Sequence, residues 1–529
     1  MILEDILKDY NKRNTFKFLA FFILSLPSFQ FSSQMQNILI STYTPKYTCL
    51  YNSSFSKISI SADQCNMIID GSTIVCNKWN FSYEPVGRTM MSDFSLVCNY
   101  KNLGDIILIV WYSTSITGPI MGWFSDKFGR KKVAIFNLCL ETISTFFVSF
   151  TPDVTSNIIC RLLIGISANG FYTCYVWLME MVDNEFREFS GSFIWTYGCL
   201  AYMVFPLTAY FTKDWRITQL ISLIPNILYF LILLFPESPR WLCVTNRKSE
   251  LIKSLNKIAE INKIDTNINY EQIFVPKTKD EHNTWKALKD KTFSLRMTLS
   301  FLLVFSINLI YAAIAVNLQI LSNNMYISMF LLGLMEFPGI LFSYVSLRFF
   351  RRKTSFILIG GIGSIFILIS VFFSRNILWQ GVIRIIFGCI AKIAVTTCNQ
   401  STMVYVSELC PTSHRSLGFA SIQLANLCSF TAAIYINKLS TVLFFLPMVI
   451  YFILMFLTSC IIYLYLPETK NLPIPETLLD QKMLKVNKEK EFLDYMNKKR
   501  EMEVESDLDL DLLKSNESTE ESHLINRKL

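Results

Sequence analysis

Long apolar runs alternate with polar stretches along most of the chain. A helix that crosses a membrane needs about 20 apolar residues, and twelve runs come close to this length or exceed it. These runs are residues 17–40, 104–124, 133–151, 156–178, 190–211, 216–235, 297–321, 326–346, 354–374, 378–406, 414–437 and 442–466. The pattern predicts an all-α integral membrane protein with twelve transmembrane helices.

The polar segments between the runs give the predicted domain organisation. The predicted parts are a cytoplasmic N-terminus at 1–16, a first six-helix half at 17–235 with an extracellular loop at 41–103, a cytoplasmic central loop at 236–296, a second six-helix half at 297–466 and a cytoplasmic tail at 467–529. In the central loop, Leu251, Leu255 and Ile258 recur at helical spacing, which predicts short surface helices. The charged tail lacks glycine and turns acidic after Glu501, a composition typical of disorder.

The composition and charge support a membrane protein and exclude one class of partner. Hydrophobic residues make up 52% of the 529 positions, too many for a soluble protein of this size. The net charge is +8, but much of it lies in short stretches between the runs, such as residues 127–132 and 348–353. Lys and Arg beside spanning helices hold loops in the cytoplasm, so the charge implies no nucleic acid. Both termini are then expected in the cytoplasm, at the plasma membrane.

Short words repeat between the two predicted halves, each near a predicted helix end. The pairs are Arg161-Leu-Leu-Ile-Gly165 with Arg384-Ile-Ile-Phe-Gly388, Glu180 and Arg187 with Glu408 and Arg415, and Pro236-Glu-Ser-Pro-Arg-Trp241 with Pro467-Glu-Thr-Lys470. Related halves that share a substrate site near the bilayer midplane are typical of secondary transporters. The repeat predicts two pseudo-symmetric six-helix halves.

A basic turn joins the second and third runs. Its sequence, Gly122-Trp-Phe-Ser-Asp-Lys-Phe-Gly-Arg-Lys-Lys132, places Asp126, Gly129 and a cluster of bases in a spacing that resembles the signature loop of major facilitator transporters. The resemblance implies the major facilitator fold. The matching turn of the second half keeps its bases, but Leu347 stands where the acid would be.

The predicted extracellular loop carries four cysteines and two acceptor triplets for N-glycosylation. Cys49, Cys65, Cys76 and Cys98 are even in number and allow three pairings, and an oxidising compartment favours disulfides. The triplets begin at Asn52 and Asn80, on a side of the membrane where glycosylation is possible.

The same loop carries the most specific resemblance. Three short sequence motifs of this loop resemble the organic cation/anion transporter family (solute carrier family 22): Pro45-Lys-Tyr-Thr-Cys49, Cys76-Asn-Lys-Trp-Asn-Phe-Ser82 and Ser92-Asp-Phe-Ser-Leu-Val-Cys98. Three motifs outside the loop resemble the same family: Phe235-Pro-Glu-Ser-Pro-Arg-Trp-Leu242, Leu331-Leu-Gly-Leu-Met-Glu-Phe-Pro338 and Ser407-Glu-Leu-Cys-Pro-Thr-Ser-His-Arg415. The resemblance implies a transporter of small organic ions. The helix 11 position that is often acidic in the family's cation carriers and basic in its anion carriers is Leu427 here, so cation, anion and zwitterion all stay open.

Ionisable residues inside a span are costly and tend to face a cavity. Glu336, close to the helix-weakening Pro338, and Lys392 are therefore the candidates for the substrate path, and a structural ion pair between helices is the alternative. The family's helix 8 likewise carries an acid at the position of Glu336. The aromatic candidates, which could hold an organic ion by stacking or cation–π contact, are Tyr172, Tyr175, Trp177 and Tyr311.

The expected mechanism is alternating access by rocking of the two halves. The candidate gating residues on the inner side are Asp126, Arg130, Glu180 and Arg187 in one charged latch, and Glu408 and Arg415 in another. Such latches would favour the outward-open state. An exposed ion pair contributes only about 0–1 kcal/mol, so several pairs must act together.

Three other functions compete with organic-ion transport as interpretations of the sequence. A sugar-porter-like facilitator would explain the Pro-Glu-Ser-Pro-Arg word but not the cysteine-bearing loop, and a transport-inactive sensor or scaffold of the same fold fits the altered second turn. An enzyme would need a catalytic constellation, and three histidines without a cysteine–histidine cluster provide neither that nor a metal site. No cofactor is expected. The expected partners are a small organic ion, the lipid bilayer and a coupling ion or exchange substrate.

Overall fold

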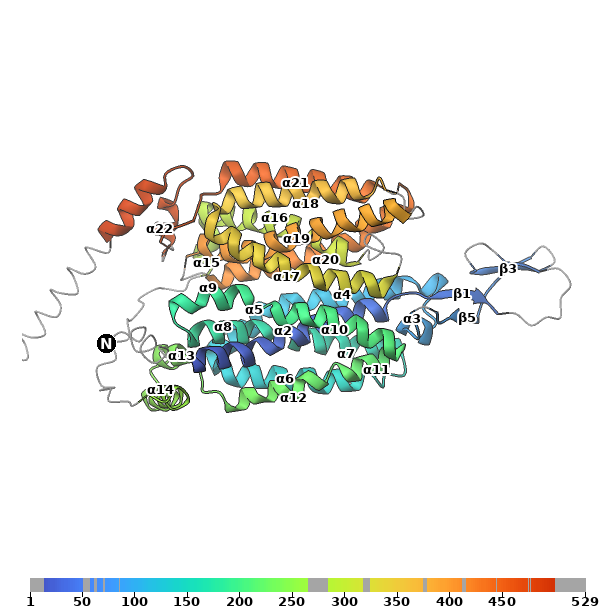
Figure 1. The fold of residues 1–529 in the computed structure, drawn as a ribbon, viewed down its shortest axis with the longest axis horizontal. Helices are drawn as coiled ribbons and strands as arrows, with labels where there is room; N and C mark the ends of the chain where they lie inside the picture. Colours follow the sequence, from blue (N-terminus) through green and yellow to red (C-terminus); the bar gives the residue numbers. More distant parts are fainter. Residues whose placement is uncertain are drawn as a thin grey trace, which may run out of the picture.

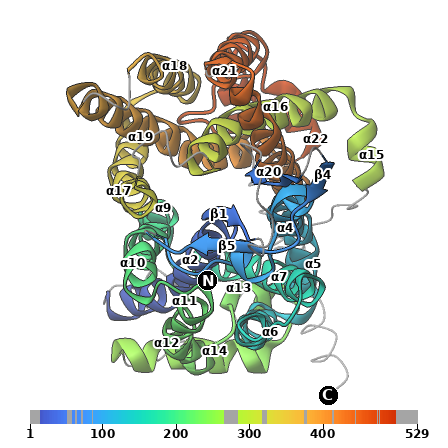
Figure 2. The same ribbon diagram turned by 90° about the vertical axis from the view of Figure 1, so that its right-hand side faces the viewer.

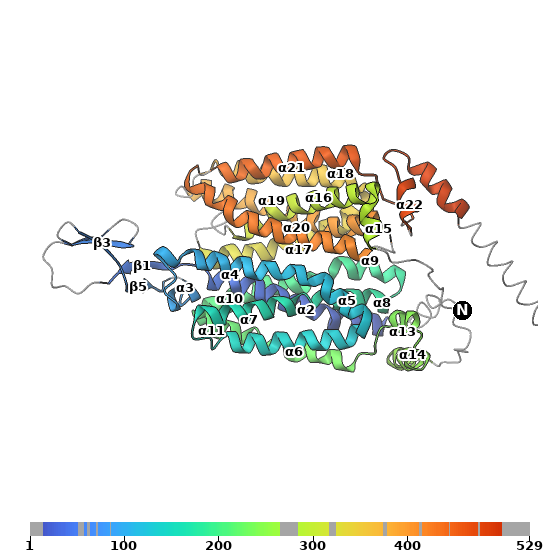
Figure 3. The same cartoon turned by 180° about the vertical axis from the view of Figure 1, so that it is seen from behind.

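Most of the helices run along one common direction and form two bundles that lie side by side (Figures 1 and 3). The computed structural model describes residues 14–50, 58–60, 64–69, 72–84, 86–264, 284–316, 324–373, 378–411, 415–443, 445–473, 475 and 477–499. The first bundle, blue to green in Figure 1, contains α2 to α12, and the second, yellow to red, contains α16 to α21.

The long helices follow the predicted apolar runs. The first bundle contains α2 (Thr15–Ser41), α4 (Asn102–Ser113), α5 (Gly118–Phe128), α6 (Arg130–Val148), α7 (Val154–Ala168), α8 (Phe171–Met181), α9 (Asn184–Phe193), α10 (Thr196–Thr212), α11 (Trp215–Ile221) and α12 (Ile224–Tyr229). The second contains α16 (Lys291–Val316), α17 (Met325–Phe349), α18 (Arg352–Ser370), α19 (Leu378–Leu409), α20 (Arg415–Lys438) and α21 (Leu446–Tyr465).

Ten stretches of the described residues are helical, long enough and apolar enough to cross a membrane. The other two predicted runs form α6 and α20, which pack beside α7 and α16 within the bundles. α6 is more charged than the ten stretches because it begins with three basic residues and contains Glu141. Each predicted run is therefore helical in the part of the chain that the structure describes, and the predicted all-α membrane fold is confirmed.

The opposite ends of the bundles differ in chemistry. At one end, here called the disulfide end, the chain between α2 and α4 projects beyond the helices as strands and a short helix, α3 (Met90–Asp93). At the other, here called the basic end, the helices α13 (Pro239–Val244) and α14 (Lys248–Asn262) lie beyond α6 and α12 (Figure 1). The two ends give fixed reference points for the site.

The two bundles share one buried core. This hydrophobic cluster joins Met35 and Trp111 of the first bundle to Ile310 and Tyr326 of the second, and within the second bundle it extends to Leu409 near the basic end. Around α13 and α14, the cluster with Trp177 belongs to the first bundle alone, and the cluster around Phe293 belongs to the second. Within the described residues, the bundles are thus closed at the disulfide end and cored separately at the basic end.

Two flanks of contact hold the bundles together. α10 packs on α17, and α4 and α5 pack on α20, on opposite sides of the end-on view in Figure 2. Gly333 allows the first contact, because a Cβ at this position would lie 2.7 Å from the backbone of Tyr202. Tyr326 of α17 donates its hydroxyl to the carbonyl of Val86, which precedes α3, at 2.5 Å, and this hydroxyl also lies 3.5 Å from the carbonyl of Ala209 in α10.

A small lobe of strands covers the disulfide end. β1 (Lys46–Cys49) pairs antiparallel with β5 (Trp79–Ser82), and β2 (Ile58–Ile60), β3 (Asn66–Ile69) and β4 (Ser72–Val75) form a second antiparallel sheet. Disulfides join Cys49 to Cys76 and Cys65 to Cys98. Of the three pairings that the sequence allows, the structure therefore selects one.

We expect both disulfides in protein taken from the cell surface, because they close the two-stranded sheet and tie the second sheet to the start of α4. Mass spectrometry of non-reduced peptides should recover one peptide pair linked through Cys49 and Cys76 and another linked through Cys65 and Cys98. Free thiols at all four positions would contradict this pairing. The cysteine at 199, buried in α10 without a disulfide, provides the reduced control.

The predicted surface helices of the central loop are present as α13 and α14. Leu251, Leu255 and Ile258 form the buried face of α14 and join the hydrophobic cluster of the first bundle. Asn262, at the last turn of α14, accepts a hydrogen bond from the backbone N–H of Phe16 at 2.9 Å. This contact ties the central loop to the beginning of α2.

The tail differs from the predicted disorder over its first part. After α21 the chain forms α22 (Leu478–Met483), whose capping box at Thr477 and Asp480 fixes its start. Arg296 of α16 donates to the carbonyls of Gln481, at 2.7 Å, and Leu484. Composition alone missed this docking, because the anchoring groups are backbone carbonyls and a buried arginine of another helix. Residues 500–529 lie outside the described part.

Candidate functional site

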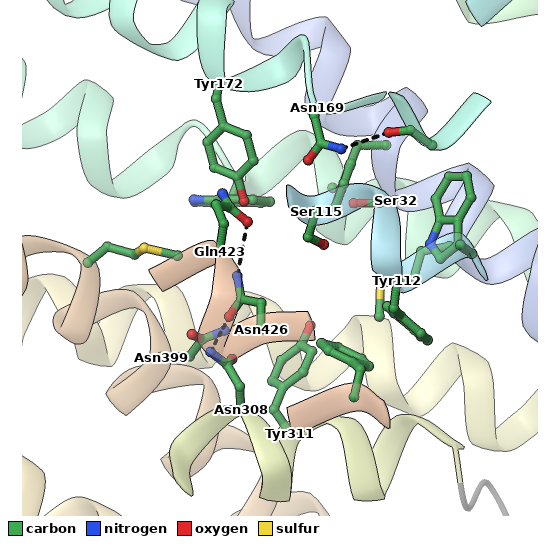
Figure 4. Close-up of a pocket in the computed structure, with 18 of the residues that line it drawn as sticks. Ser32, Tyr112, Ser115, Asn169, Tyr172, Asn308, Tyr311, Asn399, Gln423 and Asn426 are labelled. Carbon is green, nitrogen blue, oxygen red and sulfur yellow. Dashed lines mark hydrogen bonds between the residues drawn. The ribbon is translucent and has the colours of Figure 1, made fainter. Parts of the chain in front are cut away.

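A cavity lies between the bundles, with an empty space, including its opening to solvent, of about 990 Å³ (Figure 4). Aromatic and amide side chains of both bundles form most of its wall. The amides are Asn169, Asn308, Asn399, Gln400, Gln423 and Asn426. Among the described residues that line the cavity, Glu336 is the only one with a carboxylate or a basic group.

Glu336 belongs to a compact buried cluster from three helices of the second bundle. Its Oε1 lies 2.5 Å from Nζ of Lys392 in α19 and accepts a hydrogen bond of 2.6 Å from the hydroxyl of Tyr311 in α16. The ammonium also lies 3.5 Å from the centre of the Tyr311 ring. The charged side chains are only 2% and 6% exposed, so the pair compensates two charges that would otherwise be costly in a membrane protein.

The cluster presents its carboxylate to the cavity and its ammonium to the protein interior. Glu336 lines the cavity, whereas Lys392 is not part of its wall. Both described contacts of the carboxylate fall on Oε1. Within the described residues, neither of these two contacts engages the second carboxylate oxygen, Oε2.

A ladder of amide side chains from α16 and α20 forms part of the cavity wall, with Tyr172 and Tyr311 beside it (Figure 4). Asn308 of α16 donates to Oδ1 of Asn426 in α20 at 2.5 Å, and Asn426 donates to Oε1 of Gln423 at 3.4 Å. Figure 4 shows the hydroxyl of Tyr172, from α8, directed at Gln423 and close beside it. Amides both donate and accept, so this wall suits a polar group of either sense on a ligand.

Aromatic stacking closes the cavity toward the disulfide end. The rings of Tyr112 in α4 and Phe430 in α20 stack with centroids 4.0 Å apart across the two bundles. Farther out, Lys438 pairs with Asp105 at 2.5 Å, again between bundles. On the other side, Tyr172 also lines a second pocket that continues along Tyr175 and Ser407 toward the basic end. The geometry is that of a site accessible from the basic end.

The structure brings together four of the six predicted path residues around the cavity. Tyr172, Tyr311 and Glu336 line it, and Lys392 lies behind Glu336. Tyr175 lines the adjoining pocket. Trp177 does not reach either wall: it is fully buried in the hydrophobic cluster of the first bundle.

The amide ladder is the part of the site that sequence analysis missed. Gln423 and Asn426 lie three residues apart in α20, so both fall on one helix face. Polar amides at helical spacing within an apolar run were a usable signal. A pattern of charged residues does not reveal this face, because amides are uncharged.

The predicted latch of the first half surrounds Arg130. Its guanidinium makes a two-point contact with Glu180, at 2.8 and 3.1 Å, and a third bond of 2.6 Å to Asp126. The first N–H groups of α6 donate to Glu237, whose carboxylate thus caps the helix N-terminus. Burial raises the pKa of Glu237, although these N–H bonds favour its charged form.

The second half repeats this arrangement with one substitution. Arg352 makes the same two-point contact with Glu408, at 3.0 and 3.2 Å, and Glu468 caps the start of α18. The third bond of the guanidinium goes to the backbone carbonyl of Leu347, at 2.5 Å. A main-chain oxygen therefore takes the place of the missing acid.

Neither network bridges the two bundles in this structure. The described contacts of Arg130 stay within the first bundle and those of Arg352 within the second. Arg187, predicted in the first latch, donates to the carbonyl of Met179 at 3.0 Å. The side chain of Arg415 lies outside the described part. As arranged here, the networks stabilise the turns of each bundle rather than the contact between bundles.

Comparison with known proteins identifies the family. The family model described as sugar (and other) transporter matches residues 36–477. The chain belongs to this family. It is therefore a transporter and not an enzyme, in agreement with the prediction.

Several curated transporters are similar in sequence to this member of the sugar (and other) transporter family. Solute carrier family 22 member 3 of Mus musculus is 26% identical over 418 residues, covering 78% of this chain and 75% of the relative. Organic cation/carnitine transporter 2 of Homo sapiens is 26% identical over 422 residues, covering 77% and 74%. Organic cation transporter protein of Drosophila melanogaster is 26% identical and covers 88% of each chain. These relatives bear out the predicted resemblance to solute carrier family 22.

Solved structures support the fold of this family member. The proton:xylose symporter XylE bound to 6-bromo-6-deoxy-D-glucose matches with a TM-score of 0.60 and 17% identity, covering 89% of this chain and 99% of the symporter. An inward open conformation of XylE from E. coli matches with a TM-score of 0.55 and 16% identity, covering 86% and 97%. At this identity the likeness shows the major facilitator fold alone.

Proposed function

We propose that this chain carries small organic ions that bear a cationic group, either cations or zwitterions, across the plasma membrane by alternating access. The observation that carries the proposal is the position of Glu336, whose carboxylate is the one full charge in the described cavity wall. The relatives named as organic cation and carnitine transporters support the same substrate class.

A cationic group would be held by the carboxylate and by aromatic rings together. Aromatic faces attract cations by about 0.5–2 kcal/mol each, most strongly in a dehydrated site. Tyr112, Tyr202 and Tyr311 line the cavity with Glu336. The amide ladder would bind the polar remainder of the substrate, such as the carboxylate of a zwitterion.

The two ends of the bundles give the orientation in our proposal. The arginines and lysines of the basic end would face the cytoplasm, in accord with the positive-inside rule. The disulfide lobe would then face the cell exterior, where the exposed Asn80 is a glycosylation acceptor. Asn52 lies outside the described part. The cavity, reached from the basic end, would correspond to an inward-facing state.

Alternating access would follow from rocking of the bundles about the cavity. The aromatic and ionic contacts at the disulfide end would separate, and the separate cores at the basic end would come together. A coupling ion or an exchange substrate would supply the driving gradient.

An uptake panel in cells expressing this chain tests the proposal. Labelled quaternary ammonium and carnitine-like zwitterionic compounds are expected to enter above the level of untransfected cells, because both offer a cation to Glu336. A carboxylate anion and a hexose are expected to stay at background. Uptake of the anion or the hexose alone would overturn the proposed substrate class, with the hexose result indicating a sugar porter.

A further inference from the structure

A second hollow of the molecule lies at the basic end, apart from the substrate cavity. It is formed between the start of α6 and the helices α13 and α14, and its empty space, including the opening to solvent, measures about 780 Å³. Figure 3 shows α13 and α14 beyond the ends of α6 and the helices around it, away from the second bundle. Nothing in the transport mechanism uses this hollow.

Basic side chains dominate its wall. They are Lys131, Lys132, Arg247, Lys253 and Lys257, against two acids, Glu237 and Glu250. Both acids are already engaged: Glu237 caps α6, and Glu250 lies 3.7 Å from Arg247. The described residues provide no salt-bridge partner for the exposed Lys132, Lys253 and Lys257. The hollow thus carries a positive charge that the described part of the chain leaves uncompensated.

The folding of α14 creates this concentration of charge. Leu251, Leu255 and Ile258 hold one face of the helix against the bundle. Lys253 and Lys257, four residues apart, share a helix face and line the hollow together. Like charges so placed repel each other, and an anionic ligand that neutralises them is stabilising.

Exposed apolar residues, here called the apolar rim, lie next to lining residues of the hollow along the chain. Leu233 and Leu234, at the last turn before Phe235, are 47% and 62% exposed, and Val244 of α13 is 78% exposed. Lys131 links the two surfaces, because its ammonium donates to the carbonyls of Leu233 and Phe235 at 2.7 Å each. Positive charge beside exposed apolar side chains at a helix end matches the chemistry of a lipid, whose headgroup is anionic and whose chains are apolar.

We propose that the hollow between α6, α13 and α14 binds the headgroup of an anionic phospholipid, with its phosphate at Lys132, Lys253 and Lys257 and its acyl chains along Leu233, Leu234 and Val244. The apolar rim favours a membrane lipid over a free phosphate compound, because a free phosphate compound has no acyl chains that could contact apolar side chains. The proposal does not depend on which ion is transported.

The test uses the full-length protein in nanodiscs of phosphatidylcholine with increasing phosphatidylserine, and native mass spectrometry to count retained phosphatidylserine. The triple variant Lys132→Gln, Lys253→Gln, Lys257→Gln is expected to bind it about 100-fold more weakly, since each base near a membrane surface contributes about five-fold. These side chains are exposed and make no described ion pair, so the variant should fold.

The matched control removes three exposed lysines of the tail at the same end, in Lys485→Gln, Lys490→Gln, Lys498→Gln, and is expected to bind like wild type. Equal loss in both variants would show a general charge effect and overturn the site, as would unchanged binding by the first variant. Glycerophosphoserine, the soluble headgroup, is expected not to compete at concentrations matched to the lipid. Full competition by it would show a free-anion site and overturn the lipid assignment.

Discussion

Glu336→Gln is expected to lower uptake of an organic cation more than ten-fold while a misfolded fraction also accumulates. Removal of one partner of a buried ion pair costs about 3–5 kcal/mol, because Lys392, at 2% exposure, would stay buried without its carboxylate partner. The cavity would also lose its one described carboxylate. Uptake normalised to surface biotinylation separates the two effects.

The double variant Glu336→Gln, Lys392→Met distinguishes a substrate contact from a structural ion pair. It removes both buried charges, so surface expression is expected to recover toward wild type. Cation uptake should stay low, because the carboxylate is still missing. Recovery of uptake together with expression would show that Glu336 serves only to hold Lys392.

Tyr311→Phe is the matched control for this cluster. It keeps the ring 3.5 Å from the ammonium but removes the hydroxyl bond to Glu336. A single hydrogen bond to a charged group contributes about 1.5–3 kcal/mol. Surface expression should therefore fall less than in Glu336→Gln.

The fold was predictable from the sequence because membrane spans have a strict length and composition. A helix such as α21, apolar over nearly its whole length, has no alternative in a bilayer. The docked tail was not predictable in this way. Arg296 donates to backbone carbonyl groups, which every residue has. No side-chain pattern in residues 467–499 therefore predicts the contact.

The candidate site was predictable only as far as charge marks it. Glu336 and Lys392 stood out as ionisable residues within spans, and they meet in the structure. Trp177 shared the helix and residue class of Tyr172 but faces the other way, into the core of its own bundle. Which side of α8 faces the cavity depends on packing between the bundles. The spacing of polar and apolar residues along α8 does not show this in a single sequence.

The missing acid of the second half illustrates a further limit. Leu347 suggested a degenerate, inactive turn. The structure shows Arg352 fully engaged, because the carbonyl of Leu347 replaces the absent carboxylate. A side-chain motif can thus be lost while its hydrogen bond is kept by the backbone, which removes one argument for a transport-inactive protein.

Two variants of the first latch are expected to differ in their effect on stability. Arg130→Met is expected to destabilise the fold by about 3 kcal/mol and to lower surface expression, because it leaves Glu180, only 18% exposed, without its guanidinium. Asp126→Asn should leave stability within about 1 kcal/mol of wild type, since Asp126 is 67% exposed and the second half folds without its counterpart.

Transport should nevertheless fall in Asp126→Asn at normal surface level. Its exposed carboxylate lies at the basic end, where the bundles must approach each other when the cavity opens to the opposite side. Thermal unfolding, surface biotinylation and uptake measured together test both variants. A wild-type uptake rate for Asp126→Asn would show that the basic turn fixes the membrane topology and has no part in transport. Unaltered stability of Arg130→Met would mean that the two-point contact with Glu180 contributes nothing, and the equivalent contact of Arg352 in the second half would lose its role by the same argument.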